Sequence, residues 1–600
     1  MQQTSQNWKN NHNQTLVNEA FIEISYDITD PNVASNATPT DNGSVYFSNT
    51  TETITPVHKN IVPYALLEPN IWVLDGENVL LPKNQPYGDN GYIGTPMSGI
   101  EGDYDGNLKP IITVTFSENI TSHIPGITIS WAVAYGEYAK SFKVTAYNGA
   151  TEVSSIQIDD NESVISIVEI DIQNFNRLEI RPLVWSQIRH RPRISKIFIG
   201  INKTYTKSDI LKFSTNQSFD PVTASLPQNE INFDISNLNN EYDPYNEEGL
   251  TKYMMERQEI KTQYGYKIDN QVEWIDGGVY YLSEWNSPQN GLTATFKAKS
   301  LLDLLDGKYY KGKYEVTAVS LRELAAAVLT DANLPLGSDG TPMWDISKIP
   351  VTYKTSSPLP IATHAECLQL IANAAQCIMY ISRDGKLHIE PESTEITDYE
   401  MTYKNNYKRP EISLTKPLKQ VDISRYIYTV ETAAKELYSA TLPLDISGDN
   451  TFIIEYSAPA TSVTVSCPNR TIKDFKAYAN SCVLVITNSG YSNATVTISG
   501  QPLKVTESVV TITNGNTGEV QTVKNSLINS LNHATAVGNW VKDRVAKRKA
   551  LSSEWRSDPR LDVGDIVKVK NDFGEENIRV TSLTYNFNGA FNGTYDGKVL

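Results

Sequence analysis

The stretch LPQNEINFDISN, residues 226–237, decides how this chain folds. Apolar side chains alternate with polar ones from Ile231 to Ile235, which is the period of a strand with one buried face. Two further runs, Val279–Trp285 and Leu292–Ala298, are separated by a loop rich in Asn, Pro and Gly, residues that form turns. We therefore predict antiparallel β-structure with a hairpin over residues 206–310.

Toward the N-terminus the same alternation continues. Residues 1–60 begin with a polar arm and contain one alternating strand, Phe21–Tyr26. Residues 61–205 are broken into short alternating runs by Gly, Asn and Pro, a pattern typical of a β-sandwich or jelly roll. The clearest runs are Ile111–Phe116, Gly126–Trp131, Ser141–Tyr147, Arg177–Arg181 and Ile194–Ile199.

Toward the C-terminus helices enter the pattern. Ser320 with Glu323 and Thr363 with Glu366 have the spacing of capping boxes, so each pair predicts a helix start. Asp384-Gly385 predicts a tight hairpin turn, because glycine accepts a positive φ. Residues 450–505 predict a module of short strands, 523–550 a long amphipathic helix, and 555–600 a return to strands.

Length and composition set limits on the class of protein. A chain of 600 residues exceeds one hydrophobic core, and about 150 residues per domain suggests roughly four domains. Its formal net charge of −17 makes the chain a poor binder of nucleic acids, whose phosphates are also negative. Four cysteines are too few for a disulfide scaffold of this size. The start of the chain does not resemble a signal peptide, and no run of about 18 apolar residues predicts a membrane span.

Several of these groups together resemble the baseplate hub or tail-tip proteins of phages and related contractile injection particles. The resemblance spans about 206–395 and the last 50 residues. An earlier region resembles the discoidin-like jelly roll of some tail proteins. The hub groups are 226–237, Asp243–Asn246, Gly277–Leu282, Asp384–Leu387 and Asp558–Val567; the jelly-roll groups are Trp72–Gly76, Phe116-Ser117 and Arg181–Trp185.

The resemblance implies a mainly β, multidomain fold. It contains an N-terminal β-sandwich or jelly roll, two hub-type β-barrels, a small α/β domain and an inserted β module with a long helix. The expected ranges are 1–60 for the N-terminal arm and first strand, 61–205 for the discoidin-like jelly roll, 206–310 for the first barrel, 311–395 for the small α/β domain, 396–440 plus 551–600 for the second barrel, and 441–550 for the inserted module and long helix.

In function, the resemblance implies a structural protein of the virion, assembled in the bacterial host cytoplasm. Two barrels from each subunit of a homotrimer would form a pseudo-hexameric ring, closed by rotation. That ring would join a six-fold tail tube to a three-fold tip. Expected partners are further copies of the chain, a distal tail or tail tube protein, the tape measure protein and tip or fibre proteins. DNA would pass through during genome ejection without specific binding. No enzyme activity, cofactor, metal, catalytic residue or cofactor-binding residue is expected.

Two other functions remain open. A tail-associated lytic enzyme usually carries a separate peptidase or muramidase domain after the hub domains, and we expect no room for one before Leu600. A host-recognition protein would bind cell-wall glycan through the jelly roll. Trp72, Trp131 and Trp185 could stack on sugars, although alternating strands place at least two of them in the core.

Candidate chemical groups all have simple structural explanations. The histidines, 12, 58, 123, 190, 364, 388 and 533, do not show the spacing of a zinc motif. Cys367 lies on an apolar helix face with His364 one turn earlier, which favours a buried thiol over a nucleophile. Cys467 and Cys482 could form a disulfide, but assembly in a reducing cytosol favours free thiols.

Charged clusters have equally simple alternatives. Asp103–Asn107 resembles half of a calcium loop without the distal Glu, which favours a turn. An acidic group, Glu241, Asp243, Glu247 and Glu248 with Tyr242 and Tyr245, could hold a glycosidase pair, but a surface loop is the commoner explanation. A basic group, Lys542, Arg544, Lys547, Arg548 and Lys549, either complements a helix C-terminus or contacts an acidic neighbouring subunit.

Overall fold

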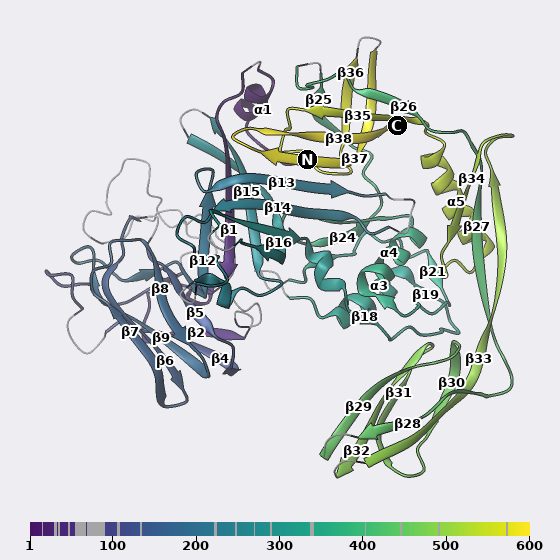
Figure 1. Ribbon diagram of the computed structural model, residues 1–600, viewed down its shortest axis with the longest axis horizontal. Helices are drawn as coiled ribbons and strands as arrows, with labels where there is room; N and C mark the ends of the chain where they lie inside the picture. The colour runs from purple at the N-terminus through teal and green to yellow at the C-terminus, as the bar shows by residue number, and fades with distance from the viewer. Residues whose placement is uncertain are drawn as a thin grey trace.

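A computed structural model gives the fold of the chain (Figure 1). It describes residues 1–600 apart from 15, 29–32, 34–35, 46–47, 55–67, 69–90, 105–108, 133–134, 221, 223–224, 247–248, 269–270, 289–290, 336–340, 403, 445–446, 490–491 and 572–573. The predicted mainly β, multidomain fold is confirmed, because strands arranged in several sheets dominate and only short helices accompany them. The α-helices among the described residues are α1 (Gln6–His12), α3 (Leu321–Ala332), α4 (His364–Ala374) and α5 (Leu531–Val545).

One 13-stranded sheet forms the centre of the molecule. Its strands are β1 (Ala20–Ile28), β12 (Ile201–Thr206), β13 (Ile210–Ser218), β14 (Gln228–Ser236), β15 (Glu259–Ile268), β16 (Gln271–Asn286), β17 (Thr293–Lys299), β25 (Ile396–Met401), β26 (Glu411–Leu414), β35 (Lys549–Trp555), β36 (Ile566–Asn571), β37 (Gly574–Phe587) and β38 (Phe591–Val599). Their main order is β12-β1-β15-β16-β17-β14-β13-β37-β38-β35-β26, with β36 and β25 branching from β37.

This sheet encloses two separate apolar cores, which define two lobes. The first lobe runs from β12 to β13 and contains Trp8, Phe233 and Phe296. The second lobe comprises β25, β26 and β35–β38 and contains Trp555 and Tyr595. The predicted alternating strand at 231–235 lies inside β14, with both neighbours paired in register, and β16 and β17 form the predicted hairpin.

The two lobes join where β13 pairs with β37, from Phe213 opposite Phe587 to Ser218 opposite Ser582. Residues from opposite ends of the chain therefore share one unbroken sheet. The predicted N-terminal strand also belongs here, as β1 between β12 and β15. The 396–440 range predicted for the second barrel divides in the structure: β25 and β26 pair with β36 and β35, whereas the later strands of that range lie in another sheet.

A β-sandwich is inserted in the chain between β1 and β12 of the first lobe. A five-stranded sheet, β2-β4-β9-β6-β7, packs on a three-stranded sheet, β11-β5-β8, around a core with Trp131 and Trp185. We call it the N-terminal sandwich. Its elements are β2 (Ala37–Asp41), η1 (Thr50–Thr53), β3 (Tyr92–Ile93), β4 (Ile112–Ile120), β5 (Ile124–Ser130), β6 (Ala139–Asn148), β7 (Thr151–Ile158), β8 (Ile165–Ile172), β9 (Phe175–Trp185), β10 (Arg193–Ile194) and β11 (Lys196–Ile199).

A small α/β region follows the first lobe. Both capping boxes are present: Ser320 and Glu323 close the start of α3, and Thr363 and Glu366 close the start of α4. Gly385 has φ +84° in the predicted hairpin turn. Its short strands are β18 (Lys308–Tyr309), β19 (Val319–Ser320), β20 (Trp344–Asp345), β21 (Lys354–Thr355), β22 (Ala362–Thr363), β23 (Ile378–Ile381) and β24 (Leu387–Glu390). Two short 3-10 helices, η3 (Leu250–Tyr253) and η4 (Leu301–Leu305), come earlier in the chain.

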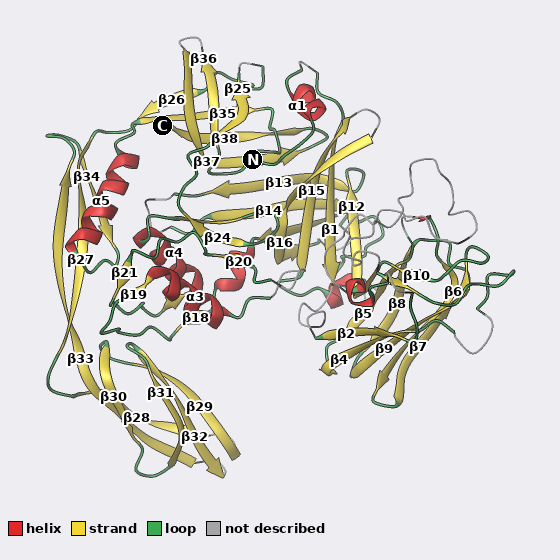
Figure 2. Ribbon diagram, turned by 180° about the vertical axis from the view of Figure 1, so that it is seen from behind, coloured by secondary structure: helices red, strands yellow, loops and turns green. Residues whose placement is uncertain are grey.

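A long ribbon and a second sandwich extend from this region (Figure 2). The ribbon pairs β27 (Leu418–Val430) with β33 (Ser492–Thr513) and β34 (Glu519–Lys524). The second sandwich, here called the arm, packs β28 (Lys435–Leu444), β30 (Ala460–Ser466) and the start of β33 on β29 (Ser447–Glu455), β31 (Thr471–Ala477) and β32 (Ser481–Ser489).

The helix predicted over 523–550 is shorter than expected. Residues up to Lys524 belong to β34, and Ser530 caps α5 by accepting a hydrogen bond from the His533 backbone. Leu527 is buried before the helix starts, whereas Leu531 is 55% exposed. The prediction was wrong at this end because apolar spacing alone does not distinguish a strand and turn that pack on the same core from a continuous helix.

Candidate functional site

The first lobe, the second lobe and the α/β region meet at Arg383. Its Nε lies 2.8 Å from Asp562 Oδ1 in the second lobe, and its Nη1 donates to the Asp276 carbonyl in β16 at 2.7 Å. Its Nη2 donates to the carbonyls of Pro559 and Leu561 at 2.7 and 2.9 Å. The Arg383 side chain is almost fully buried, and burial would lower its pKa, but Asp562 and neighbouring groups raise it overall. The Arg383 guanidinium, which stays charged, thus connects three parts of the molecule through its hydrogen bonds.

The N-terminal segment crosses the same junction. Trp8 packs edge-on against Tyr266 of the first lobe, with ring centroids 5.0 Å apart. Lys9 Nζ lies 2.5 Å from Asp398 of the second lobe. Arg556, also in the second lobe, donates to the His12 carbonyl at 2.6 Å. Helix α1 and the residue that ends it therefore contact both lobes and link them. The sequence pattern had predicted only a polar arm for this segment.

His12 is buried at this junction. Its Nε2 lies 3.2 Å from the Tyr399 hydroxyl and 4.0 Å from Asp558 Oδ2. Burial lowers the pKa of His12 to about 4, and Arg556 and Arg560 add to this while Asp558 opposes it. Burial alone would raise the pKa of the Asp558 carboxyl, but His12 and Arg560 hold it below its ordinary value. Asp558 is therefore an ionised partner for Arg560.

The other described histidines each have a local partner within the chain. His58 lies outside the described residues. Among the described residues, no group of three or more His, Cys, Asp or Glu side chains is placed to hold a metal ion. A ring nitrogen of His123 contacts Asp171, one of His190 contacts Glu137, and one of His364 contacts Asp331. A ring nitrogen of His388 contacts Ser382, and one of His533 contacts the Ala374 carbonyl.

All four cysteines are buried and free. Burial raises the pKa of Cys367 and of Cys377 to about 12, and that of Cys482 to about 11. A nucleophilic cysteine needs a lowered pKa and access to substrate, so Cys367 has the properties of a core side chain. Cys467 and Cys482 lie in the arm core as separate thiols.

The two described carboxylates of the acidic cluster, Glu241 and Asp243, have separate partners. Glu241 forms an ion pair with Lys203 at 3.0 Å, and Asp243 accepts the Tyr245 backbone N–H at 2.9 Å. Tyr242 is buried and its hydroxyl contacts that of Tyr205. Glu247 and Glu248 lie outside the described residues, as do positions 105–107 of the candidate calcium loop. Asp243 and Tyr242 thus stabilise a loop of the first lobe.

The basic residues predicted at the end of the long helix are largely engaged within the chain, but only Lys542 and Arg544 lie in α5, because the helix ends at Val545 and Lys549 begins β35. Arg544 contacts Glu392 at 2.5 Å and donates to the Trp540 carbonyl near the helix end. Lys549 pairs with Glu576 at 2.5 Å, and Arg548 donates to the Thr415 carbonyl at 2.8 Å. The Arg544 contact fits the helix-end interpretation. Contact with an acidic neighbouring subunit stays a prediction.

Of the three tryptophans considered for sugar stacking, Trp131 and Trp185 are buried in the N-terminal sandwich. Trp72 lies outside the described residues. The Trp185 indole donates to Glu137 Oε2 at 2.8 Å, and the Trp131 indole donates to Ser166 at 2.8 Å. Both rings are therefore enclosed on their faces and tied at their polar ends, so neither offers a stacking platform.

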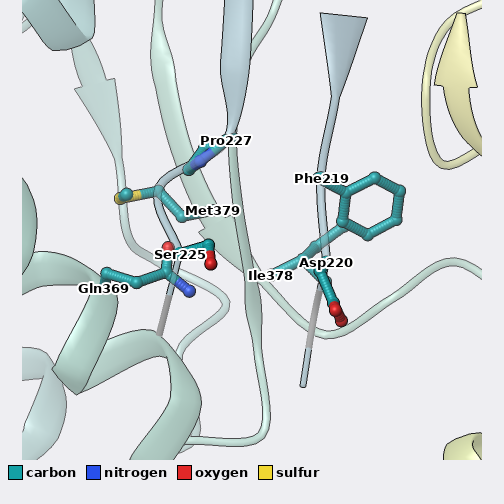
Figure 3. Close-up of a pocket in the computed structure, with 7 residues that line it drawn as sticks. All are labelled: Phe219, Asp220, Ser225, Pro227, Gln369, Ile378 and Met379. Carbon is teal, nitrogen blue, oxygen red and sulfur yellow. The ribbon is translucent and has the colours of Figure 1, made fainter. Parts of the chain in front are cut away.

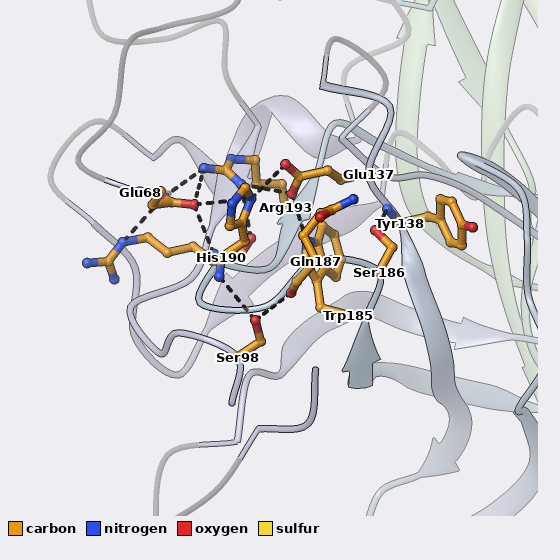
Figure 4. Close-up of polar contacts among 10 residues, drawn as sticks. Glu68, Ser98, Glu137, Tyr138, Trp185, Ser186, Gln187, His190 and Arg193 are labelled. Atoms are coloured by element: carbon orange, nitrogen blue, oxygen red, sulfur yellow. Dashed lines mark hydrogen bonds and ion pairs between the residues drawn. The ribbon is translucent and has the colours of Figure 1, made fainter. Parts of the chain in front are cut away.

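A buried ionic network, which the sequence analysis missed, surrounds Trp185 (Figure 4). Glu137 Oε1 lies 2.7 Å from His190 Nδ1, so this nitrogen donates to the carboxylate. Arg193 binds Glu68 through two bonds of 2.7 and 2.8 Å and approaches Glu137 at 3.5 Å. The four charged or ionisable side chains are all nearly inaccessible to solvent. The only sequence signal was the density of charge at 189–193.

One hollow lies between the first lobe and the α/β region. Phe219, Asp220, Ser225, Pro227, Gln369, Ile378 and Met379 line it, as Figure 3 shows. Its volume of about 190 Å³ includes space open to solvent. Because part of even this volume is open solvent, the hollow is too small to hold a drug-sized ligand.

No helix among the described residues is both long and apolar enough to cross a membrane.

Phage tail proteins are among the solved structures to which this chain is similar. A 43 kDa tail protein of prophage MuSo2 from Shewanella oneidensis is 11% identical, with 66% of this chain and 95% of that chain covered and a TM-score of 0.36. A tail protein from Neisseria meningitidis MC58 is 9% identical, with 66% and 93% covered and a TM-score of 0.37. Chitosan-binding module 1 of a Paenibacillus chitosanase/glucanase is 10% identical, with 29% and 98% covered and a TM-score of 0.17. No family model and no curated protein matches the sequence.

Proposed function

We propose that this protein is a structural hub subunit of a phage tail tip or baseplate. Three copies would form a pseudo-hexameric ring that joins a six-fold tail tube to a three-fold tip. The ring would enclose the channel for tape measure protein and DNA. Its other partners would be a distal tail or tube protein and tip or fibre proteins. The protein would act in the virion without catalysis.

The observation that carries this proposal is the pair of lobes in one sheet. Each lobe has its own core, and pairing of β13 with β37 fuses them side by side. Three subunits with two lobes each would supply six lobes to a three-fold ring, which is the geometry needed to match two symmetries. Arg383 and α1 support this role, because both hold the lobes in a fixed relation.

The environments of the candidate reactive groups support a structural role over a catalytic one. Each candidate nucleophile or base among the described residues is buried, paired or both, and the described hollow is small. Neither a lytic activity nor glycan binding is favoured by a specific observation, since Trp131 and Trp185 lie in the core. We therefore retain the hub as the proposed function.

Native mass spectrometry of the purified full chain, alone and with its neighbouring tail proteins, tests the proposal. We expect a trimer whose subunit contacts bury more than about 2,000 Å² in total, as obligate assemblies do. Negative-stain images of the same sample should show a ring with a central opening. A folded chain that stays monomeric with its tail partners, or one that lyses cell walls in a zymogram, would overturn the proposal.

A further inference from the structure

Two strands of the molecule end their sheets with an open edge. Strand β8 ends the three-stranded sheet of the N-terminal sandwich, and β26 ends the main path of the large sheet. Among the strands that the structure describes, β8 pairs with β5 alone and β26 pairs with β35 alone. Each strand therefore presents backbone N–H and C=O groups along one side, where a further strand can pair.

The exposed side of β8 is apolar and acidic. Exposed and buried residues alternate along this strand, so every second side chain faces solvent. Ile165 and Ile167 are 48% and 45% exposed, and the exposed Glu169 and Asp171 follow on the same side. Residues 159–172, which we call the acidic edge, contain five acidic residues and no Lys or Arg.

The exposed side of β26 is apolar and basic. Ile412 and Leu414 are 55% and 64% exposed. Residues 408–419, which we call the basic edge, contain four basic residues and one acidic residue, Glu411, in a chain whose formal net charge is −17. The basic residues, all exposed, are Lys408, Arg409, Lys416 and Lys419.

Ion pairs within the chain do not prevent the basic edge from binding a partner. Lys408 contacts Glu554, and Lys416 lies 2.8 Å from Glu519, with most of each lysine side chain exposed. Exposed ion pairs contribute little to stability, because water screens them. An acidic group on another molecule can therefore replace either glutamate at little cost.

Protection of the two sheet edges does not by itself explain this composition. Proteins often place charges, especially Lys, on an open edge strand to prevent unwanted pairing. A protective strand gains nothing from large aliphatic side chains in solvent, and it can use either sign of charge. Here each edge combines two exposed aliphatic side chains with charge of almost one sign, and the two signs are opposite. This combination fits strands that pair with a specific partner.

A second copy of this chain has the matching chemistry. The two edges lie at opposite sides of the molecule in both views, so they do not meet within one copy (Figures 1 and 2). The N-terminal sandwich is inserted between β1 and β12, at the β12 end of the main path, whereas β26 forms the other end. Copies arranged head to tail therefore bring the basic edge of one toward the sandwich of the next, and such contacts close into a ring when the rotation permits.

We propose that the basic edge of one copy pairs with the acidic edge of a neighbouring copy, so that β26 extends the sheet that β8 ends. This inference rests on the proposed hub function and adds the identity of one contact between subunits. Backbone hydrogen bonds between the two strands supply binding, and the exposed aliphatic side chains of both leave water. The opposite charges select the correct pair of edges and speed their encounter.

Charge reversal tests the contact in the 600-residue chain. Glu169→Lys with Asp171→Lys reverses the acidic edge, and Lys408→Glu with Lys416→Glu reverses the basic edge. We expect each double variant to weaken self-association by about tenfold or more, because like charges then face each other. The chain with all four changes should associate within about threefold of the natural chain, because opposite charges again face each other.

Sedimentation velocity over a concentration series measures these associations. A matched control, Glu455→Lys with Lys476→Glu, reverses two exposed charges on the arm and should leave association unchanged. Thermal unfolding of each variant checks that its fold is intact. If both double variants are weakened and the fourfold variant does not recover, the two edges do not face each other and the proposal is wrong.

Cross-linking identifies the partner, because all four native thiols are buried. Glu169→Cys and Ser413→Cys each place a thiol at an exposed position of one edge. A short bismaleimide should join the two variants when they are mixed, and neither variant alone should give a dimer. A dimer from one variant alone would show that an edge meets its own equivalent, which would overturn the proposal.

The outcomes separate this inference from the hub proposal. If the natural chain does not self-associate, with or without its tail partners, both fail. If a trimer forms and charge reversal leaves it unchanged, the subunits meet elsewhere and only the inference fails. If the edges cross-link to another tail protein and not to each other, that protein is the partner and the inference is equally overturned.

Discussion

Arg383 Nε lies 2.8 Å from Asp562 Oδ1, although 179 residues separate the two in the chain. The same guanidinium donates three further hydrogen bonds to backbone carbonyls in the first and second lobes. Four contacts from one buried group connect a hairpin of the α/β region with both halves of the large sheet. This junction gives the most direct test of the architecture.

Replacing Arg383 with Ala should destabilise the joined lobes strongly. The change removes the Arg383 donor from three backbone carbonyls and from Asp562 Oδ1, and breaking a buried pair in this way costs about 3–5 kcal/mol. Urea unfolding followed by tryptophan fluorescence is the measurement, because Trp8 and Trp555 lie in the two cores. Lys348→Ala is the control, since it removes an exposed cation that pairs with Glu390. Similar losses for both variants would contradict the role of Arg383.

His12 should make the lobe junction sensitive to acid. Its pKa is about 4 in the fold against 6.5 when exposed, so the unfolded chain takes up a proton first as pH falls. Stability from this group is therefore complete above pH 6.5 and is lost as pH falls from 6.5 toward 4. The loss between neutral pH and pH 5 should be on the order of 2 kcal/mol.

Thermal unfolding of the natural chain and of His12→Gln, each from pH 7.5 to pH 5, measures this effect. We expect the difference between the two proteins to shrink as pH falls, because the variant lacks the group that becomes protonated. Other titrating groups, such as Asp27, whose pKa burial raises to about 6, act equally in both proteins. A constant difference across this range would exclude His12 as the source.

Glu137 should be the most sensitive position of the N-terminal sandwich. Glu137→Ala removes the acceptor of the Trp185 indole and of His190 Nδ1 and leaves Arg193 with Glu68 as its only carboxylate partner, at a cost of about 3–5 kcal/mol. Differential scanning calorimetry should resolve a transition that moves to lower temperature. Glu118→Ala, at an exposed strand position, should leave it within about 0.5 kcal/mol of the natural chain. The prediction fails if the two variants have the same transition.

The four cysteines should not react with thiol reagents until the chain unfolds. Each is buried, and burial raises the pKa of Cys367, Cys377 and Cys482, so little thiolate is present at neutral pH. A thiol titration should detect almost no reaction in buffer and all four groups in denaturant, with or without prior reduction. Detection of only two groups without reductant would reveal a disulfide, with Cys467 and Cys482 as the first candidates.

The edge strand β26 should contribute to ring contacts. It ends the main path of the large sheet, and its Ile412 and Leu414 are 55% and 64% exposed. An apolar edge left open is prone to pairing with another chain, so a second copy is the expected partner in the proposed ring. Ile412→Lys should weaken self-association by about tenfold or more with the unfolding temperature unchanged. Sedimentation velocity over a concentration series gives the comparison, with Lys404→Ala as the surface control. Unchanged association would exclude β26 from the contact.

Local signals in the sequence predicted the individual elements well. The alternation at 231–235 is β14, and the Ser320–Glu323 and Thr363–Glu366 spacings are complete capping boxes. Asp384-Gly385 forms the expected turn. These features depend on neighbours a few residues apart, where backbone geometry and side-chain type are sufficient. The start of α5 was wrong because Leu527 packs on the helix side of the core without belonging to the helix.

Contacts between distant segments could not be predicted in the same way. The sequence by itself determined a mainly β, multidomain chain with no recognisable metal or nucleophile motif, because periodicity and composition encode burial. Only the tertiary structure decided that β13 pairs with β37, that Arg383 reaches Asp562, and that Glu68, Glu137, His190 and Arg193 meet. Which distant strands pair, and which charged groups become buried together, depends on how whole segments pack against one another and exclude water. A local sequence pattern contains no information about that packing.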